Sequence, residues 1–197
     1  MTAGAQDRSA EMSDAEVRRQ LARLLAEKEI RDVLNRYAQG VDRRDWDQVR
    51  SAYHDDAHDD HGQLGGAPDE FVAQVRKRHE NVLSSIHLVS NVGIDLDDDC
   101  RAARVESYCL SFQQVDPAGA NDPFADPQSK STRTTIGCRY VDDFKFREGA
   151  GWRIAKRLLV VEWMRRENDE DYVPAHSSWT LPHRDRTDPL YAPRPSA

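Results

Sequence analysis

The sequence has few cysteines, no long apolar run and no basic cluster that is free of neighbouring acids. Cys100, Cys109 and Cys138 are odd in number and lack CxxC or histidine spacing, so we expect small buried or half-buried thiols in strands. No stretch approaches the roughly 18 apolar residues of a membrane span, and the N-terminus has no apolar signal core. The net charge of −7 argues against nucleic acid, because phosphate binding requires a basic face. We therefore expect a soluble, cytoplasmic protein that binds neither nucleic acid nor membrane.

The 197 residues are enough for one domain with a proper core and tails. Residues 1–13 are small and polar, which predicts a disordered N-terminus. We place the domain at residues 14–165. Residues 166–197 are charged and then rich in proline, which predicts an extended C-terminal tail.

Three helices are expected in the first half of the chain. Ser13 and Glu16 form a capping-box pattern ahead of a helix that runs to about residue 43. Asp45 is positioned to cap a second helix over residues 46–53, and a third begins at Pro68 and extends through residues 82 and 83. The acidic residues 54–60 between them predict a solvated turn that leads into a glycine-rich loop.

From residue 86 onward the hydrophobic period changes to two, which is typical of strands. We expect strands at residues 86–96, 103–115, 132–146 and 152–163, with a long loop at residues 116–130. Helices followed by a meander of strands is the order of an α+β domain, not of βαβ units.

Two polar side chains occur on or beside the apolar stripe of the first helix. Ile30, Val33 and Leu34 begin that stripe, and Tyr37 continues it at the i, i+3, i+4, i+7 spacing. A buried tyrosine hydroxyl needs a partner, and a carboxylate at the position of Asp42, at the edge of the stripe, is costly unless it is paired. Such a position is typical of a base held under an apolar pocket.

Several spaced motifs resemble the SnoaL-like branch of the NTF2-like superfamily, over roughly residues 20–165. They are RYAQGVDRRDWD, SSIHLVSN, ARVESYCLSF, GCRYVDDFKFREGAGWRIAKR and RDRTDPLY, in that order. The resemblance implies a cone, in which a strongly curved, mostly antiparallel sheet wraps N-terminal helices and leaves a central pocket. The proline-containing segment at 116–130 is not part of the shared pattern.

Within that superfamily, scytalone dehydratase, hexachlorocyclohexane dehydrochlorinase and bile-acid 7α-dehydratase place a helix aspartate and a strand histidine in one pocket. By resemblance Asp42 is the aspartate, His87 the general base, and Arg157 the arginine that meets the departing group. Tyr37 falls where the bile-acid enzyme has a tyrosine. The segment ESYCLSF departs from the pattern where a second acid or histidine is expected, so the proton donor to the leaving group is unassigned.

Three further residues are candidate substrate contacts, namely Tyr53, His61 and Tyr108. The lyases named above form homotrimers and other members form dimers, so the resemblance favours a homo-oligomer, preferably a trimer. An extended tail with Trp179 and Tyr191 needs a surface to lie on, and we expect it to cross a subunit boundary.

The chemistry fits these residue types independently of the resemblance. A neutral histidine can take a proton from carbon near neutral pH, because its free pKa is about 6.5. A carboxylate on its other nitrogen fixes the tautomer and stabilises the imidazolium. Tyrosine hydroxyls and an arginine can stabilise the developing charge, and no metal or organic cofactor is required.

Each candidate also has a structural interpretation. Asp42 could cap the second helix or pair with Arg43 or Arg44, and the tyrosines could be core aromatics. The histidines and aspartates at 54–61 could hold a metal, but alternate residues of a strand face opposite sides, so we expect none.

Two function classes therefore remain. The first is a cofactor-independent lyase or isomerase acting on a small hydrophobic substrate such as a steroid, polyketide or aromatic catabolite. The second is a non-catalytic ligand-binding or structural protein similar to the β subunit of ring-hydroxylating dioxygenases; a polyketide cyclase is a third possibility. An Asp42–His87 hydrogen bond in an open pocket would favour the first class.

Overall fold

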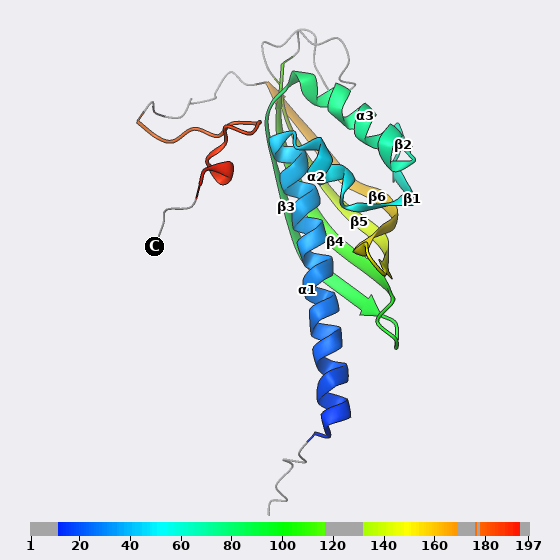
Figure 1. The fold of residues 1–197 in the computed structure, drawn as a ribbon. Coiled ribbons are helices and arrows are strands. Elements are labelled where there is room, and N and C mark those ends of the chain that lie inside the picture. The colour runs from blue at the N-terminus through cyan, green and yellow to red at the C-terminus, as the bar shows by residue number, and fades with distance from the viewer. Residues whose placement is uncertain (1–11, 117–131, 169–175, 177, 194–197) are drawn as a thin grey trace, which may run out of the picture.

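The computed structural model describes residues 12–116, 132–168, 176 and 178–193. Within these ranges, three α-helices lie on a six-stranded curved sheet (Figure 1). The predicted α+β cone is confirmed. Residues 1–11 of the N-terminus expected to be disordered (1–13), and most of the expected loop at 116–130, lie outside the described residues.

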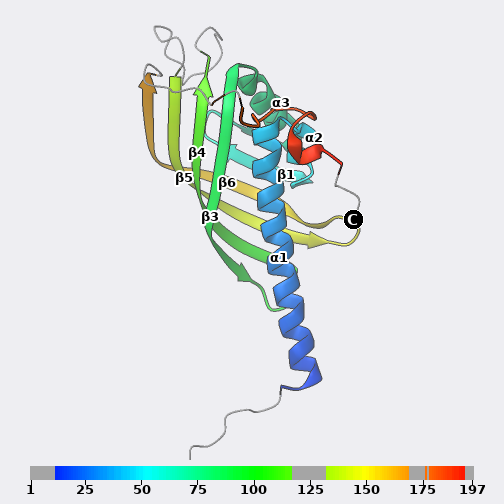
Figure 2. The same ribbon diagram turned by 90° about the vertical axis from the view of Figure 1, so that its left-hand side faces the viewer.

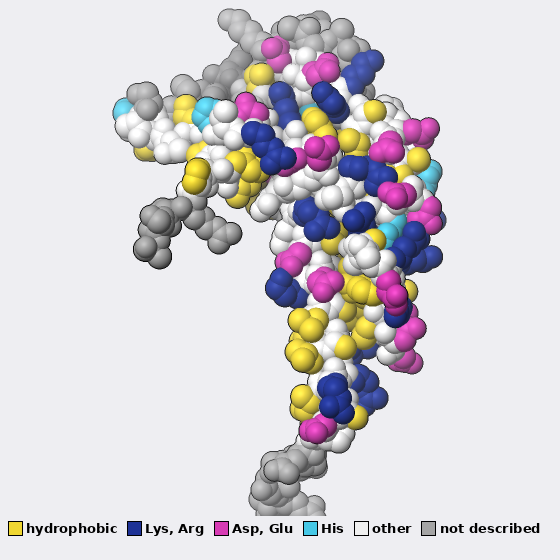
Figure 3. All heavy atoms as spheres, viewed as in Figure 1, with side chains coloured by type: hydrophobic (Ala, Val, Ile, Leu, Met, Phe, Trp, Pro, Cys, Tyr) yellow, Lys and Arg dark blue, Asp and Glu magenta, His cyan; other side chains and the backbone are white. Residues whose placement is uncertain are grey.

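Helix α1 (Asp14–Arg43) is the longest helix and runs along one face of the sheet (Figure 2). Ser13 caps it by accepting a hydrogen bond from the Glu16 N–H at 3.3 Å. The C-terminal half is buried through an apolar stripe that begins at Ile30, as predicted. The N-terminal half extends beyond the strands, and Figure 3 shows hydrophobic side chains on it among acids and bases.

A close approach of α1 to α2 (Trp46–Arg50) determines how the chain turns after α1. A Cβ atom at Gly40 would lie 2.8 Å from Cγ2 of Val49, so only glycine allows the two helices to pack this tightly. Arg44 ends α1 in the left-handed conformation with φ 55°. The predicted cap is confirmed, because Oδ1 of Asp45 accepts from the Gln48 N–H at 3.2 Å.

The sheet contains one parallel pair, β1–β6, and is otherwise antiparallel, with strand order β2-β1-β6-β5-β4-β3. The strands are β1 (Tyr53–His61), β2 (Leu64–Gly66), β3 (Val82–Leu96), β4 (Ala102–Val115), β5 (Thr132–Arg147) and β6 (Gly151–Asn168). Register shifts occur in β3 between Ser90 and Gly93, and in the pairing of β5 with β6, where Gly137 pairs with Trp163 and Cys138 with Val161. Such bulges bend strands, and they accompany the curvature that wraps the sheet around α1.

Several sequence-based boundaries are wrong; β6, for example, runs to Asn168 and does not end at residue 163. The acidic residues 54–60 form most of β1 instead of a turn, because Ala57 and Asp59 alternate into the core while Asp60 faces solvent. Helix α3 (Pro68–Arg78) ends before the short 3-10 helix η1 (His79–Asn81), so residues 82 and 83 open β3. Tyr53 begins β1 and does not end the second helix.

The described part of the C-terminal tail returns to its own α1. It includes the 3-10 helix η3 (Pro189–Tyr191). Ion pairs join Arg43 to Asp188 at 3.2 Å and Arg186 to Asp45 at 2.9 Å. The expected contact of this tail with a neighbouring subunit stays a prediction. Among the described helices, none is long and apolar enough to cross a membrane.

Candidate active site

A cavity of about 280 Å³ lies between the helices and the concave side of the sheet. Most of its wall is apolar, and three histidines, one arginine and two glutamines are among the polar residues that interrupt that wall. The lining residues are Tyr37, Val41, His61, Gln63, Leu64, Phe71, Val75, Arg78, His79, His87, Ser111, Gln113, Ile136, Cys138, Tyr140, Leu159, Val161 and Met164. A mostly apolar cavity with few polar groups is typical of a site for a small organic ligand.

Asp42 occupies the last turn of α1, where the chain lies against the start of β3. Its Oδ1 accepts a hydrogen bond from Oγ of Ser85 at 2.8 Å and contacts Nδ1 of His87 at 2.6 Å. Its Oδ2 accepts from the backbone N–H of His87 at 2.9 Å. Asp42 is only 8% exposed, and these three contacts satisfy its carboxylate without the helix-capping role that Asp45 takes.

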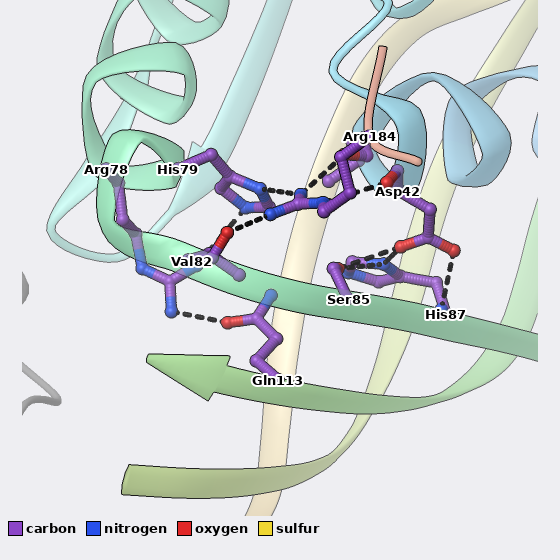
Figure 4. A network of polar contacts seen from close by, with 9 residues as sticks. Asp42, Arg78, His79, Val82, Ser85, His87, Gln113 and Arg184 are labelled. Atoms are coloured by element: carbon purple, nitrogen blue, oxygen red, sulfur yellow. Dashed lines mark hydrogen bonds and ion pairs between the residues drawn. The ribbon is translucent and has the colours of Figure 1, made fainter. Parts of the chain in front are cut away.

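His87 is oriented by that carboxylate (Figure 4). Because an ionised carboxylate only accepts hydrogen bonds, Nδ1 of His87 carries a proton in this contact. Nε2 has no hydrogen-bond partner among the described residues. His87 lines the cavity, so Nε2 is the ring nitrogen available to a ligand.

Arg184 of the tail lies directly behind the dyad, where it joins three separate segments (Figure 4). Its guanidinium donates to the backbone oxygens of Asp42 at 2.9 Å and Val41 at 3.1 Å, and also to that of Val82. Its Nη2 also donates to Nδ1 of His79 at 2.8 Å. Burial, and secondarily the charge of Arg44, lowers the pKa of Arg184 to about 10, so it remains a cation near neutral pH.

His79 therefore has a defined role as an acceptor. Burial, with the charges of Arg78 and Arg184, holds the pKa of its imidazole well below the ordinary value. A neutral ring that accepts at Nδ1 carries its proton on Nε2. On the cavity wall beside it, Arg78 donates to Oε1 of Gln113 at 2.6 Å.

A second histidine–aspartate pair lies on β1. Nδ1 of His61 contacts Oδ1 of Asp59, and Oδ2 of Asp59 accepts from the Tyr53 hydroxyl at 2.5 Å. Asp59 and Tyr53 are both 0% exposed. The His61 ring packs against Phe71, with centroids 4.8 Å apart, and against Tyr140 at 6.0 Å.

Arg157 lies in the core behind the tyrosines, not in the cavity wall. It donates to both carboxylate oxygens of Asp142, at 2.8 and 2.7 Å, and its guanidinium lies 4.4 Å from the Tyr37 ring centroid and 4.1 Å from that of Tyr140. Burial opposes its charge, but the Asp142 carboxylate, together with Tyr53 and Tyr37, raises the pKa of Arg157 well above its ordinary value. Burial also raises the pKa of Tyr37, whose phenol therefore remains a hydrogen-bond donor.

The candidate residues thus fall into three groups. Tyr37, His61 and His87 line the cavity, and Asp42 supports His87 from behind. Arg157 and Tyr53 belong to the buried network behind the wall. Tyr108 is 45% exposed on the outer side of β4 and does not line the cavity.

Sequence reasoning missed several members of the site. Ser85 lies two residues before His87, so the period of a strand could have placed both on one face. Arg184 begins the motif RDRTDPLY, but nothing in that motif indicates that its side chain reaches Asp42 across 142 positions of sequence. Asp59 was missed because its surroundings have the composition of a turn.

This arrangement can remove a proton from carbon and stabilise the charge that develops. His87 is a base with a fixed tautomer, and Arg78, Gln113 and Tyr37 supply donors on the same wall. Among the described residues, no three His, Cys, Asp or Glu side chains are grouped so as to hold a metal ion.

Sequence and structure comparisons agree with this architecture. The SnoaL-like domain family matches residues 22–158, and the chain belongs to that family, within the NTF2-like superfamily. No curated protein matches the sequence.

Three similar solved structures illustrate the range of relatives. The hexachlorocyclohexane dehydrochlorinase LinA-type3 from Novosphingobium barchaimii is 18% identical with a TM-score of 0.65, covering 79% of this chain and 99% of its own. The Kfla4162 protein from Kribbella flavida is 15% identical with a TM-score of 0.60, covering 73% and 95%. ActVI-ORFA from Streptomyces coelicolor is 14% identical with a TM-score of 0.52, covering 69% and 97%. At these identities the likeness shows the shared fold alone.

Proposed function

We propose that this protein is a cofactor-independent lyase or isomerase that acts on a small hydrophobic, oxygenated molecule. The observation that carries the proposal is the 2.6 Å contact between Nδ1 of His87 and Oδ1 of Asp42 at the wall of an apolar cavity. The base and the carboxylate that orients it are therefore both side chains of this protein. Together they supply a general base whose tautomer is fixed.

In the proposed reaction, Nε2 of His87 takes a proton from a carbon beside a carbonyl group. Asp42 stabilises the imidazolium that forms, and Ser85 holds the carboxylate in position. Tyr37 and Arg78 are positioned on the wall to donate hydrogen bonds to the enolate oxygen. Arg157 acts indirectly, since it fixes the rings of Tyr37 and Tyr140 by stacking on them.

The cavity supports a substrate that is mostly apolar with one or two oxygen functions. Its volume of about 280 Å³ lies close to the lower end of the range for small-ligand pockets. A compact aromatic catabolite or polyketide fragment fits that size most readily, and a steroid would need the open end of the cavity as well. The relative LinA-type3 is a dehydrochlorinase, which supports elimination as the reaction type.

We also propose that the protein works as a homo-oligomer, by resemblance a trimer, in the cytoplasm. The outer side of the sheet supports this, because several large apolar side chains there are exposed. They include Ile86 and Leu88 on β3, Leu110 and Phe112 on β4, and Trp163 on β6.

The proposal is tested by exchange of a substrate-like ketone with deuterated water. The probe is 4-phenylbutan-2-one, which has exchangeable protons beside its carbonyl and no leaving group. We expect the wild-type protein to accelerate exchange and His87→Gln to reduce the rate by about 100-fold or more. His58→Gln, which alters an exposed histidine of β1, is the matched control and should behave as the wild type.

Three outcomes would contradict the proposal. Exchange that is equally fast in His87→Gln would show that His87 is not the base. A wild-type protein that binds ketones in the cavity without exchanging them would instead favour the non-catalytic ligand-binding class, and cyclisation of a polyketide probe without elimination would favour a cyclase.

A further inference from the structure

The histidines of the two histidine–aspartate pairs line the same cavity from strands that lie far apart in the sheet order. His61 belongs to β1 and His87 to β3, and the curvature of the sheet brings both to one cavity wall. In both residues Nδ1 contacts a carboxylate, and Nε2 has no hydrogen-bond partner among the described residues. The cavity is therefore lined by two oriented imidazoles, but the proposed reaction has so far used only one.

The charges around His61 differ from those around His87. Asp59, Arg157 and Asp142 are neighbours in register on β1, β6 and β5, and all three are 0% exposed. Two buried carboxylates and one guanidinium leave a net charge of −1 when His61 is neutral. A protonated His61 cancels that charge, and buried charges are stable only when they are paired.

The remaining groups that face His61 do not supply this missing positive charge. Tyr53 on β1, Tyr140 on β5 and Tyr37 on α1 are phenols, and burial raises the pKa of each, so they stay neutral. Phe71 on α3 contributes only an apolar ring.

Around His87 the balance is reversed. One carboxylate, Asp42, is accompanied by the cation Arg184 behind it, and Arg44 lies near enough to lower the pKa of Arg184. Arg78 lines the same wall as His87. Among these groups around His87, cations therefore outnumber carboxylates.

We propose that His61 is the general acid of the elimination, held as an imidazolium by Asp59 and Tyr53, opposite the neutral base His87. This inference rests on the proposed function and supplies the proton donor that the sequence motifs leave unassigned. Nε2 of His87 takes the proton from the carbon beside the carbonyl, and the carbon–oxygen bond at the next carbon breaks. Nε2–H of His61 gives its proton to the departing oxygen, so the products are an alkene and water. Exchange with solvent then removes the proton from His87 and returns one to His61.

The protonation states are tested directly by ¹⁵N NMR of histidine-labelled full chain near neutral pH, with signals assigned through His61→Gln and His87→Gln. We expect both ring nitrogens of His61 to carry protons and His87 to be neutral with its proton on Nδ1. Asp59→Asn should convert His61 to the neutral form and leave His87 unchanged. A neutral His61 in the wild-type protein would overturn the proposal.

The catalytic role is tested with two matched probes. Dehydration of 4-hydroxy-4-phenylbutan-2-one requires both an acid and a base, whereas deuterium exchange of 4-phenylbutan-2-one requires only the base. We expect His61→Gln to slow dehydration by about 100-fold or more and to slow exchange far less, because exchange breaks no carbon–oxygen bond and needs no proton donor to a leaving group. Retained exchange also shows that the variant is folded.

The outcomes separate the two proposals. Dehydration that is unchanged in His61→Gln, while exchange is intact, would overturn His61 as the acid and leave the proposed function standing. A wild-type protein that catalyses neither reaction would overturn the proposed function, and the acid with it.

Discussion

The two histidine–aspartate pairs have the same contact geometry but arise in different ways. Asp42 and His87 are 45 positions apart and meet only because α1 lies against β3. Asp59 and His61 are two positions apart on one strand, so the alternation of β1 is sufficient to place them on one face. A local pair forms wherever the strand forms, whereas the distant pair requires the whole cone to be assembled.

The pairs also differ in what surrounds the carboxylate. Asp42 is 8% exposed and accepts from Ser85 and from the backbone and side chain of His87. Asp59 is 0% exposed and lies beside the buried Arg157–Asp142 ion pair. The same pair of residue types therefore lies beside cations in one case and beside buried carboxylates in the other, and the base and acid roles that we propose follow this difference.

The largest expected effect is that of Asp42→Asn on catalysis. An amide at this position can present its NH₂ group to Nδ1 of His87, which would stabilise the wrong tautomer and remove the charge that supports the imidazolium. We expect the turnover rate for ketone exchange to fall by about 10³-fold. The measurement is the exchange rate under saturating ketone, with Asp60→Asn, an exposed acid of β1, as the control. A loss below about tenfold would show that the dyad is not the basis of catalysis.

The next largest effect is expected in the network behind His61. Arg157→Met leaves Asp142 buried without its partner, and breaking such a pair costs about 3–5 kcal/mol of unfolding free energy. Urea denaturation measures the loss, and Lys156→Met on the exposed side of the same strand is the control. Arg157→Met combined with Asp142→Leu should recover most of it, because the unpaired charge is gone. A single variant as stable as the wild type would mean that the ion pair does not organise the core.

A smaller effect is expected where the tail supports the base. Arg184→Ala removes hydrogen bonds to three backbone oxygens and to His79, and we expect unfolding to become easier by about 1–3 kcal/mol. Ketone exchange should also slow, because the backbone of Asp42 loses its support. Arg186→Ala, which removes an exposed arginine of the same tail, should change neither quantity appreciably. Equal effects of the two variants would contradict the positioning role of Arg184.

The smallest effect is a dependence of stability on pH that originates at His79. Because burial lowers its folded-state pKa well below the ordinary 6.5, the unfolded chain binds a proton at His79 before the folded chain does. This contribution to stability is complete above the unfolded pKa and is lost as the pH falls from it towards the folded pKa. The loss is about 1.4 kcal/mol per pH unit within that window. In His79→Gln the slope of unfolding free energy against pH should be correspondingly smaller; an identical slope would contradict a buried neutral His79.

The parts of the molecule that could be predicted from sequence are those in which hydrophobic residues recur with the period of a helix or of a strand. The apolar stripe of α1 and the alternation in β3 place Asp42 and His87 on faces that meet, and both boundaries of α1 follow from local signals. The spacing of Lys156 and Arg157 also implies that only one of them enters the core, and it is Arg157.

The parts of the fold and of the site that were not predicted depend on contacts between distant residues, which no local sequence pattern indicates. Strand β1 was misread because Asp59 is buried through its partners Tyr53 and His61, so polar composition did not indicate exposure. In the sequence, residues 82 and 83 continue the apolar stripe of a helix. Only the pairing of Val82 with Val115 shows that they belong to a strand. The position of Arg184 depends on the tail folding back on α1, which sequence spacing alone does not determine.

The central claim is that His87 acts as the base and His61 as the acid. It is tested most directly by the pH dependence of dehydration of 4-hydroxy-4-phenylbutan-2-one in the wild type and in His61→Gln. The account predicts a bell-shaped wild-type profile, in which the rate falls on the acid side as His87 gains a proton and on the alkaline side as His61 loses one. His61→Gln should lose the alkaline limb and keep the acid limb. A wild-type profile with a single limb, or a bell that His61→Gln leaves unchanged, would contradict the assignment of base and acid to the two histidines.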